Sequence, residues 1–334
     1  MILVTGGAGY VGSHTCIALM EAGEEVVVLD NFSNSKPTSL DRVQRICGKP
    51  LHVIEADIRD QTVIEKTLTR FACRAVMHFA GLKSVQESVE QPLHYYDHNV
   101  IGSHRLLCAM KNCGVRQIVF SSSATVYGEP VTLPISEDHP LAPVNPYGRT
   151  KLIIEEMLRD QYASDPAWGV AILRYFNPAG AHESGLIGED PNGTPNNLVP
   201  FVAQVAIGRR ERLQVWGSDY DTPDGTGVRD YVHVMDLAAG HVAALRQLHK
   251  QNYFAVNLGT GRGNSVLEVV RAFEQASGKN IPYDLKGRRA GDVDACYAAT
   301  TYASDLLGWR SARSLANICQ DHWRWQSANP KGFA

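Results

Sequence analysis

Short apolar runs alternate with longer stretches of helical periodicity through the first half of the chain. The candidate strands are nearly continuous apolar segments at 2–5, 25–29, 51–55, 75–79, 117–121 and 170–174. Helical patterns between them cover 11–22, 61–71, 92–113 and 147–162. Strands that lack polar alternation are typical of a parallel sheet with helices on both faces. The pattern therefore predicts an α/β fold built on a doubly wound parallel sheet.

The pattern changes beyond residue 176. Residues 177–197 and 219–227 are rich in Gly, Pro, Asn and Asp, which predicts loops, and a further apolar strand follows at 255–258. We therefore expect one domain at 1–176, rejoined by about 232–262. The remainder, mainly 177–334, is predicted to form a smaller interleaved C-terminal α/β domain.

Composition and charge exclude several classes of protein. The net charge of −3 lacks the basic surplus of a nucleic-acid or anionic-membrane binder. No apolar run is long enough to cross a membrane, and the N-terminus does not resemble a signal peptide, so a cytoplasmic location is expected. The seven cysteines are odd in number and form no CxxC pair, which argues against a disulfide framework or a zinc site. No metal is expected.

Three glycines lie between the first strand and the first helix. Gly6, Gly9 and Gly12 form a G-x-x-G-x-x-G pattern. Glycine there permits a tight turn and lets backbone N–H groups approach a pyrophosphate at the helix N-terminus. A purely structural turn is the alternative. In this context the pattern indicates a Rossmann-type dinucleotide-binding sheet.

Acidic residues close two of the following strands. Asp30 comes 18 residues after Gly12, where a carboxylate can accept hydrogen bonds from both hydroxyls of an adenine ribose. It would repel the 2′-phosphate of NADP, so NAD is favoured. Asp57 and Ile58 after the third strand, and residues 79–81 after the fourth, also suit cofactor contacts. A helix N-cap is an equally good interpretation of Asp57.

A tyrosine and a lysine share one helix face at the start of a predicted helix. Tyr147 and Lys151 are four residues apart. A free tyrosine has a pKa of about 10, and lowering it to about 7 needs roughly 4 kcal/mol of differential interaction. We expect Lys151 and a nicotinamide to supply that interaction. Spacing alone also fits an exposed, inert pair. Ser121 to Ser123 end the fifth strand; Ser123 could bridge tyrosine and substrate, whereas Ser121 better suits a solvated turn or N-cap.

Longer motifs resemble a known family. They are residues 5–12 (TGGAGYVG), 79–83 (FAGLK), 121–128 (SSSATVYG), 147–151 (YGRTK), 174–178 (RYFNP), 195–198 (PNNL), 227–236 (GVRDYVHVMD) and 288–292 (RRAGD). Together they resemble the extended short-chain dehydrogenase/reductases. Along essentially its whole length the chain is similar to the UDP-glucose/UDP-galactose 4-epimerase family within that superfamily.

The resemblance implies roles for individual residues. Tyr147 matches the catalytic acid/base, Ser123 the hydrogen-bond donor to the sugar O4, and Lys151 the residue that binds the nicotinamide ribose. Implied NAD contacts are Gly6, Gly9, Tyr10, Val11, Gly12, Asp30, Asn31, Asn34, Ser35, Asp57, Ile58, Phe79, Ala80, Gly81, Lys83, Asn99, Ser121, Tyr147, Lys151 and Phe176. Implied substrate contacts are Lys83, Ser123, Tyr147, Asn177, Asn197, Leu198, Val215, Trp216, Arg229, Arg289, Asp292 and Cys296.

The implied reaction interconverts UDP-galactose and UDP-glucose by transient NAD-dependent oxidation at sugar C4. The first domain would bind NAD and the second the UDP-sugar, and the helices at 92–113 and 147–162 match those that form a homodimer bundle in the family. A 4,6-dehydratase would need an acidic pair where Ala124 and Thr125 follow Ser123. A decarboxylase, a UDP-pentose 4-epimerase and, less favourably, a non-catalytic NAD-sensing regulator remain as alternatives.

Two positions depart from the family pattern. His98 precedes Asn99 where the family often has two asparagines, and we expect a surface histidine. Cys296 aligns with a position that limits sugar size. A tyrosine there resembles enzymes restricted to UDP-glucose and UDP-galactose, whereas a small residue leaves room for a 2-acetamido group. We therefore expect UDP-N-acetylgalactosamine and UDP-N-acetylglucosamine as further substrates, unless Tyr297 occupies that place instead.

Overall fold

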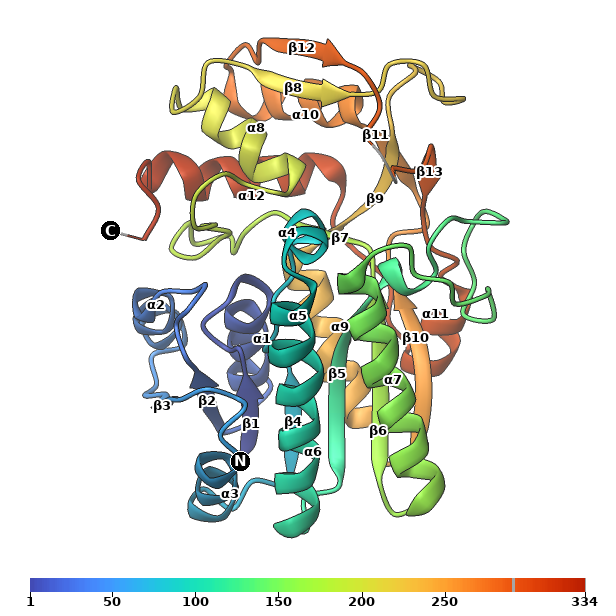
Figure 1. Ribbon diagram of the computed structural model, residues 1–334. Coiled ribbons are helices and arrows are strands. Elements are labelled where there is room, and N and C mark those ends of the chain that lie inside the picture. The colour runs from blue at the N-terminus through green and yellow to red at the C-terminus, as the bar shows by residue number, and fades with distance from the viewer. Residues whose placement is uncertain (290–291, 334) are drawn as a thin grey trace.

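A seven-stranded parallel sheet forms the centre of the computed structural model (Figure 1), which describes residues 1–289 and 292–333. Every neighbouring pair of strands in this sheet runs parallel. In spatial order the strands are β10 (Tyr253–Leu258), β6 (Gly169–Tyr175), β5 (Gln117–Ser123), β4 (Ala75–His78), β1 (Ile2–Thr5), β2 (Val26–Asp30) and β3 (His52–Glu55). The predicted doubly wound α/β sheet is confirmed.

Helices cover both faces of the sheet because its strands are apolar on both sides. Ile2 and Val4 pack into one hydrophobic cluster, whereas Leu3 between them packs into another, as the two-residue period of a strand requires. On the first face lie α1 (Tyr10–Glu21), α2 (Pro37–Cys47), α9 (Val234–Gln247) and α11 (Thr301–Leu307). On the second lie α3 (Gln61–Arg70), α6 (Gly102–Asn112) and α7 (Pro146–Ser164).

A smaller α/β group stands at one end of the large sheet (Figure 1). It contains the strands β7 (Asn177–Ala179), β9 (Val228–His233), β11 (Gly263–Ser265) and β13 (Ala295–Cys296), with a separate pair formed by β8 (Leu213–Trp216) and β12 (Tyr283–Lys286). The helices α8 (Leu198–Ala206), α10 (Val266–Ser277) and α12 (Leu315–Ala328) share a hydrophobic cluster with these strands. Between β9 and β11 the chain returns to the large sheet as α9 and β10.

Local elements differ from the sequence prediction in three places. The predicted helix at 92–113 is three consecutive pieces, α5 (Pro92–Tyr95), a π-helical turn η1 (Tyr96–Ile101) and α6. Sequence periodicity did not predict α2 or α4 (Val85–Glu90). The predicted loop at 177–197 begins as β7, because Asn177 opens a strand that pairs with β9. The domain boundaries proposed from the sequence stay a prediction. Within the described residues no helix is long and apolar enough to cross a membrane.

Candidate active site

The glycine turn between β1 and α1 has no room for side chains. Gly6 has a φ of +70°, and a Cβ there would lie 2.5 Å from the backbone nitrogen of Ala80. A Cβ on Gly12 would lie 2.3 Å from the Gly6 carbonyl oxygen. Gly9 begins α1 without a side-chain cap. The turn is therefore a crowded backbone site whose uncapped N–H groups suit a pyrophosphate, and Tyr10 and Val11 follow it directly.

Asp30 joins this turn to the loop after β2. Its Oδ2 accepts from the Ala8 N–H at 2.9 Å, while its Oδ1 accepts from the Phe32 N–H at 2.9 Å and the Ser35 hydroxyl at 2.8 Å. A carboxylate has about four lone-pair sites, so these three bonds leave capacity for a ribose hydroxyl. Asn31 and Asn34 in the same loop are exposed. The residues present fit the adenosine side of NAD.

Asp57 lies beside this loop but does not cap a helix. Its carboxylate pairs with Arg59 at 2.7 Å and accepts from Asn31 at 3.1 Å, and these hydrogen bonds, chiefly that of Arg59, hold its pKa well below the ordinary value. Asp60 caps α3 instead, by accepting from the Val63 N–H. The N-cap alternative for Asp57 is therefore wrong. Ile58 is buried, and its side chain fills the space beside Gly102.

The segment after β4 is held by Asn99. Its side-chain oxygen accepts from the Leu82 N–H at 2.8 Å, and its amide nitrogen donates to the Leu82 carbonyl and to Thr150, each at 3.0 Å. The N–H groups of Phe79 and Ala80 both donate to the Thr5 carbonyl, and Gly81 lies against the Asn99 amide. Asn99 thus ties the cofactor-side loop to α7.

His98, its neighbour, is only partly exposed, because 17% of its side chain reaches solvent. Its ring contacts that of His94 in a tilted arrangement, with 4.1 Å between centroids. Both histidines belong to the helical stretch that includes the π turn at Tyr96–Ile101 or the turn before it.

Lys83 and Asn197 meet through a glutamate that the sequence did not single out. The buried Glu189 accepts from the Lys83 ammonium at 3.0 Å and from the Asn197 amide at 2.7 Å through the same oxygen. Its other oxygen, Oε2, has no hydrogen-bond partner among the described residues. Glu189 lies in an irregular loop more than 100 residues from Lys83, so no local pattern could have revealed the contact.

The predicted reactive residues converge where β5 ends beside α7. Asn145 caps α7 by accepting from the Gly148 N–H, and Pro146 occupies the first turn. This places the buried Tyr147 and Lys151 one turn apart, with the Lys151 ammonium 5.8 Å from the Tyr147 ring centroid. The Ser123 hydroxyl lies close enough to Tyr147 to act on the pKa of its phenol. The predicted Tyr147–Ser123–Lys151 group is thus one compact cluster.

Burial governs the proton affinity of this cluster. It raises the pKa of Tyr147 above the ordinary value; the nearby Tyr175 raises it further, and the Ser123 hydrogen bond acts in the opposite direction. Burial also lowers the pKa of Lys151 to about 8, while Glu155 acts to raise it. The expectation that Lys151 lowers the Tyr147 pKa is therefore not met by the protein's own charges. The ammonium group donates to the Ser121 carbonyl at 2.8 Å instead.

The three serines of β5 have three different partners. The hydroxyl of Ser121 is buried and bonds to Tyr175 at 2.5 Å, so a solvated turn or N-cap is wrong for this residue. Ser122 donates to Glu155 at 2.5 Å. Ser123 accepts from the backbone and hydroxyl of Thr125, at 3.2 and 3.0 Å, and so caps the short 3₁₀ turn η2 (Ala124–Val126).

Two arginines predicted to bind substrate lie in the smaller α/β group, each with its own partner. Trp216, at the end of β8, carries the Arg289 guanidinium 4.9 Å from its ring centroid, and the preceding Val215 is buried. Arg229 on β9 lies 3.7 Å from Asp292. Guanidinium groups suit a diphosphate because their planar forks pair with its oxygens. Ala290 and Gly291 of the RRAGD motif lie outside the described residues.

Cys296 and Tyr297 point in opposite directions, as neighbours in an extended chain must. Cys296 pairs in register with Arg229 and packs against a cluster that includes Phe176 and Ala124. Burial raises the pKa of its thiol to about 11, with Arg229 opposing. The Tyr297 ring lies beside Gly263, where a Cβ would come within 3.2 Å of it. Of the two residues, Cys296 is the one that packs against the cluster containing Phe176.

The remaining predicted contacts are brought to the same end of the sheet. Asn177 follows Phe176 directly and opens β7, and Leu198 is the first residue of α8 after Asn197. Sequence reasoning missed Glu155 as well as Glu189. For Glu155 a signal existed, because residues 147, 151 and 155 recur at four-residue spacing along one helix face.

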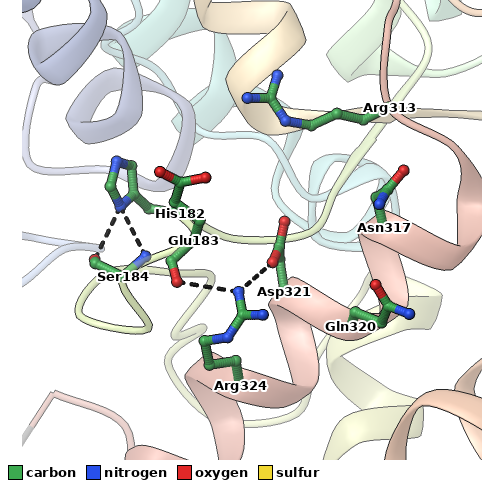
Figure 2. A pocket seen from close by; sticks show the side chains of 8 residues that line it. All are labelled: His182, Glu183, Ser184, Arg313, Asn317, Gln320, Asp321 and Arg324. Atoms are coloured by element: carbon green, nitrogen blue, oxygen red, sulfur yellow. Dashed lines mark hydrogen bonds and ion pairs between the residues drawn. The ribbon is translucent and has the colours of Figure 1, made fainter.

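A polar surface pocket of about 620 Å³ lies elsewhere (Figure 2). His182, Glu183, Ser184, Arg313, Asn317, Gln320, Asp321 and Arg324 line it, and none of the predicted site residues does. Its arginines already have partners, because Arg324 pairs with Asp321 and Arg313 with Asp236. We therefore assign the chemistry to the Tyr147 cluster and not to this pocket.

Comparison with known proteins agrees with this geometry. The family model described as GDP-mannose 4,6 dehydratase matches residues 3–322. The UDP-glucose 4-epimerase of Bacillus subtilis is 57% identical over 99% of this chain and 98% of its own, and the human enzyme of that name is 56% identical with the same coverage. The crystal structure of Bifidobacterium longum UDP-glucose 4-epimerase in complex with NAD+ and UDP superposes with a TM-score of 0.96, at 51% identity and 99% coverage of both chains.

Proposed function

The chain belongs to the UDP-glucose 4-epimerase family of the extended short-chain dehydrogenase/reductases, and from this we propose that it interconverts UDP-galactose and UDP-glucose with NAD as cofactor. One observation carries the proposal. Tyr147 and Lys151 are buried one turn apart on α7, beside Ser123 at the carboxyl end of β5, where an open α/β fold binds its ligands.

The chain's own residues perform the proton chemistry and hold the substrate. Tyr147 takes the proton of the sugar 4-hydroxyl and later returns it, while Ser123 hydrogen-bonds the same oxygen. Lys151 places a positive charge beside Tyr147, and together with the charge of bound NAD it favours the phenolate against the effect of burial. Bound NAD supplies the hydride acceptor for C4 and the donor for its return. Arg229 and Arg289 hold the diphosphate, so that the hexose can turn over between the two transfers.

The arrangement also separates this reaction from its neighbours. A 4,6-dehydratase needs an acid and a base beside the reactive hydroxyl. Here Ala124 is buried, and the Thr125 hydroxyl donates a hydrogen bond to the Ser123 hydroxyl at 3.0 Å. A non-catalytic NAD sensor would not need a buried lysine behind a buried tyrosine. A UDP-pentose 4-epimerase uses the same residues and remains the second candidate, to be separated by a substrate panel.

We infer further that N-acetylated UDP-sugars are accepted. Cys296 lies in the cluster with Phe176 and Ala124, and its thiol leaves space that a phenol would fill. Tyr297 cannot take its place without reversing the strand, because its ring packs at Gly263. The assay compares UDP-galactose with UDP-N-acetylgalactosamine. A kcat/KM for the acetylated sugar about 1,000-fold lower, as expected when a group clashes with its pocket, would reject this inference.

The test of the main proposal uses purified protein, UDP-galactose and no added NAD. Formation of UDP-glucose is expected, since a cofactor that is reoxidised in every cycle need not leave the protein. Extraction and enzymatic assay of NAD from the same preparation checks the cofactor. If a preparation loaded with NAD leaves UDP-galactose unchanged, the proposal is wrong.

We also propose a homodimer in the cytoplasm. The helices proposed for the interface lie beside large exposed apolar side chains, of which Val89 on α4 is 62% and Leu93 on α5 is 82% exposed. Burying such a patch against a second copy is the usual way to remove it from water. Sedimentation velocity should give twice the chain mass. A monomer at micromolar concentration would contradict the dimer.

A further inference from the structure

Glu155 is the third residue on the helix face that carries the reactive pair. Tyr147, Lys151 and Glu155 follow one another at four-residue intervals on α7. All three are buried, and Glu155 is only 4% exposed. A charged side chain at that depth has to be compensated by partners. Its partners come from the two strands that pass beneath the helix.

Those partners are a serine and an arginine. Ser122 on β5 donates to Glu155 Oε1 at 2.5 Å, and Arg174 on β6 pairs with both carboxylate oxygens, most closely at 2.6 Å. Arg174 also donates to Tyr127 at 3.2 Å, and its pKa is raised above the ordinary value, since these hydrogen bonds outweigh its burial. The carboxylate therefore locks α7 to the two strand ends.

The same strand end holds both other members of the site. Lys151 donates to the Ser121 carbonyl, one residue before the serine that Glu155 holds. Ser123, one residue after it, lies close enough to Tyr147 for its hydroxyl to act on the Tyr147 pKa. Glu155 therefore fixes the middle of a three-residue segment whose two ends set the positions of Lys151 and Tyr147.

We propose that Glu155 is a positioning residue for the reaction, which, with Ser122 and Arg174, holds Lys151 in place and keeps it cationic beneath Tyr147. The inference rests on the proposed function and deepens it. Glu155 touches neither substrate nor cofactor in this scheme. It acts through Lys151 and through the β5 segment.

The charges around Lys151 make Glu155 the one acidic group acting on it among the described residues. β4 contributes His78, whose pKa burial lowers to about 3, so the ring is neutral. β6 contributes Arg174 and Tyr175, and α5 contributes Tyr95 near Tyr147. The pKa of Lys151 is lowered by burial to about 8, with Glu155 alone acting to raise it. Without that carboxylate the lysine loses its proton at lower pH, and Arg174 adds repulsion.

The pH dependence of kcat distinguishes this positioning role from a purely structural one. The basic limb of the pH profile is the fall in kcat at high pH. If this limb reports loss of the Lys151 proton, removing the Glu155 charge should move it to lower pH. A movement of about one pH unit corresponds to roughly tenfold in kcat on the limb. An ion pair that only stabilises the fold would lower the yield or the melting temperature and leave the limb where it was.

The experiment compares kcat and KM for UDP-galactose from pH 6 to 10 in the natural protein, Glu155→Gln and Glu156→Gln. Glu156 is the next residue on α7 and its side chain is 51% exposed, so it is the matched control. We expect Glu155→Gln to lose about tenfold in kcat at pH 9 and much less at pH 6, with KM unchanged within about twofold. Glu156→Gln should match the natural protein throughout.

Glu155→Gln leaves Arg174 without its charged partner and can fail to fold. A second variant therefore tests the same prediction without an unpaired charge. Glu155→Leu with Arg174→Leu removes both charges together, and an apolar pair of similar size is tolerated in many buried sites. This double variant should show the same movement of the basic limb of kcat to lower pH. A third variant, Ser122→Ala, removes one hydroxyl, keeps the charge, and should lower kcat without moving the limb.

Limb positions that coincide in all folded Glu155 variants, or an unchanged kcat in Ser122→Ala, would overturn the inference. The natural protein is assayed first. If it does not convert UDP-galactose, the proposed function fails; if it converts the sugar and the limbs coincide, only the role of Glu155 fails.

Discussion

A methyl group at Gly12 should weaken cofactor binding. The magnitude of this effect can be worked out from the geometry of the turn. A Cβ at this position would lie 2.3 Å from the Gly6 carbonyl oxygen and 2.9 Å from the Cα of Gly7. Both neighbours are backbone atoms, which cannot rotate away. Contacts under 3.0 Å are essentially never tolerated by a Cβ, so the helix start must retreat by at least about 0.7 Å.

Such overpacking typically costs about 1–3 kcal/mol. The retreat also withdraws the uncapped N–H groups at the start of α1 from the pyrophosphate, so part of the cost falls on NAD affinity. If all of it did, binding would weaken by about 5- to 150-fold. Gly9 provides a graded comparison, because its Cβ would lie 3.2 Å from the same Gly6 oxygen and its φ of −70° suits any residue. Gly9→Ala should therefore cost much less.

The assay is NAD retained by purified protein, measured after denaturation by enzymatic cycling, together with the thermal unfolding midpoint. The expected order of NAD content is natural protein, then Gly9→Ala, then Gly12→Ala. Gly287→Ala is the control, since a Cβ there meets nothing within 4 Å. Full NAD content and an unchanged midpoint in Gly12→Ala would refute the steric reasoning, and so would a reversed order of the two glycines.

Three further substitutions test individual roles. Tyr147→Phe should lower kcat by about 100-fold or more, the usual contribution of a general acid/base, while bound NAD and the melting temperature stay unchanged; near-normal turnover would remove Tyr147 from its role. Cys296→Tyr should reduce kcat/KM for UDP-N-acetylgalactosamine by about tenfold or more and leave UDP-galactose within about threefold, since only the acetamido group needs the space; equal losses for both sugars would contradict this. Arg229→Ala should raise KM for UDP-galactose by about 10- to 100-fold, the worth of hydrogen bonds to a charged group, and an unchanged KM would exclude a diphosphate contact.

Local patterns were sufficient wherever one segment carries the whole signal. The glycine turn could be predicted because the contact that excludes a Cβ at Gly12 is with Gly6 in the same turn, although the contact of Gly6 with Ala80 comes from a distant segment. Tyr147 and Lys151 could be predicted as a pair because a helix brings residues four apart onto one face. Glu155 belongs to the same spacing, but nothing in the spacing shows that Arg174 lies opposite, so the sequence did not single out this buried ion pair.

Predictions went wrong where a side chain's surroundings come from another segment. Ser121 looked like part of a solvated serine cluster, yet Tyr175 from the neighbouring strand covers its hydroxyl. Asp57 looked equally like an N-cap, yet the N-cap of α3 is Asp60, three residues later. The lowered pKa expected for Tyr147 assumed that the charge of Lys151 outweighs the effect of burial. The balance of those two effects depends on how the surrounding helices and strands pack.

By itself, then, the sequence determined the alternation of strands and helices through most of the first half of the chain, the glycine turn, the apolar character of both sheet faces and the candidate reactive pair. Each of these depends on the period of a single segment or on steric contacts between near neighbours. Only the tertiary structure decided that Glu189 links Lys83 with Asn197, that Glu155 pairs with Arg174, and that Cys296 rather than Tyr297 packs against the cluster containing Phe176. These contacts depend on strand register and loop packing between residues far apart in the chain, and no local periodicity records them.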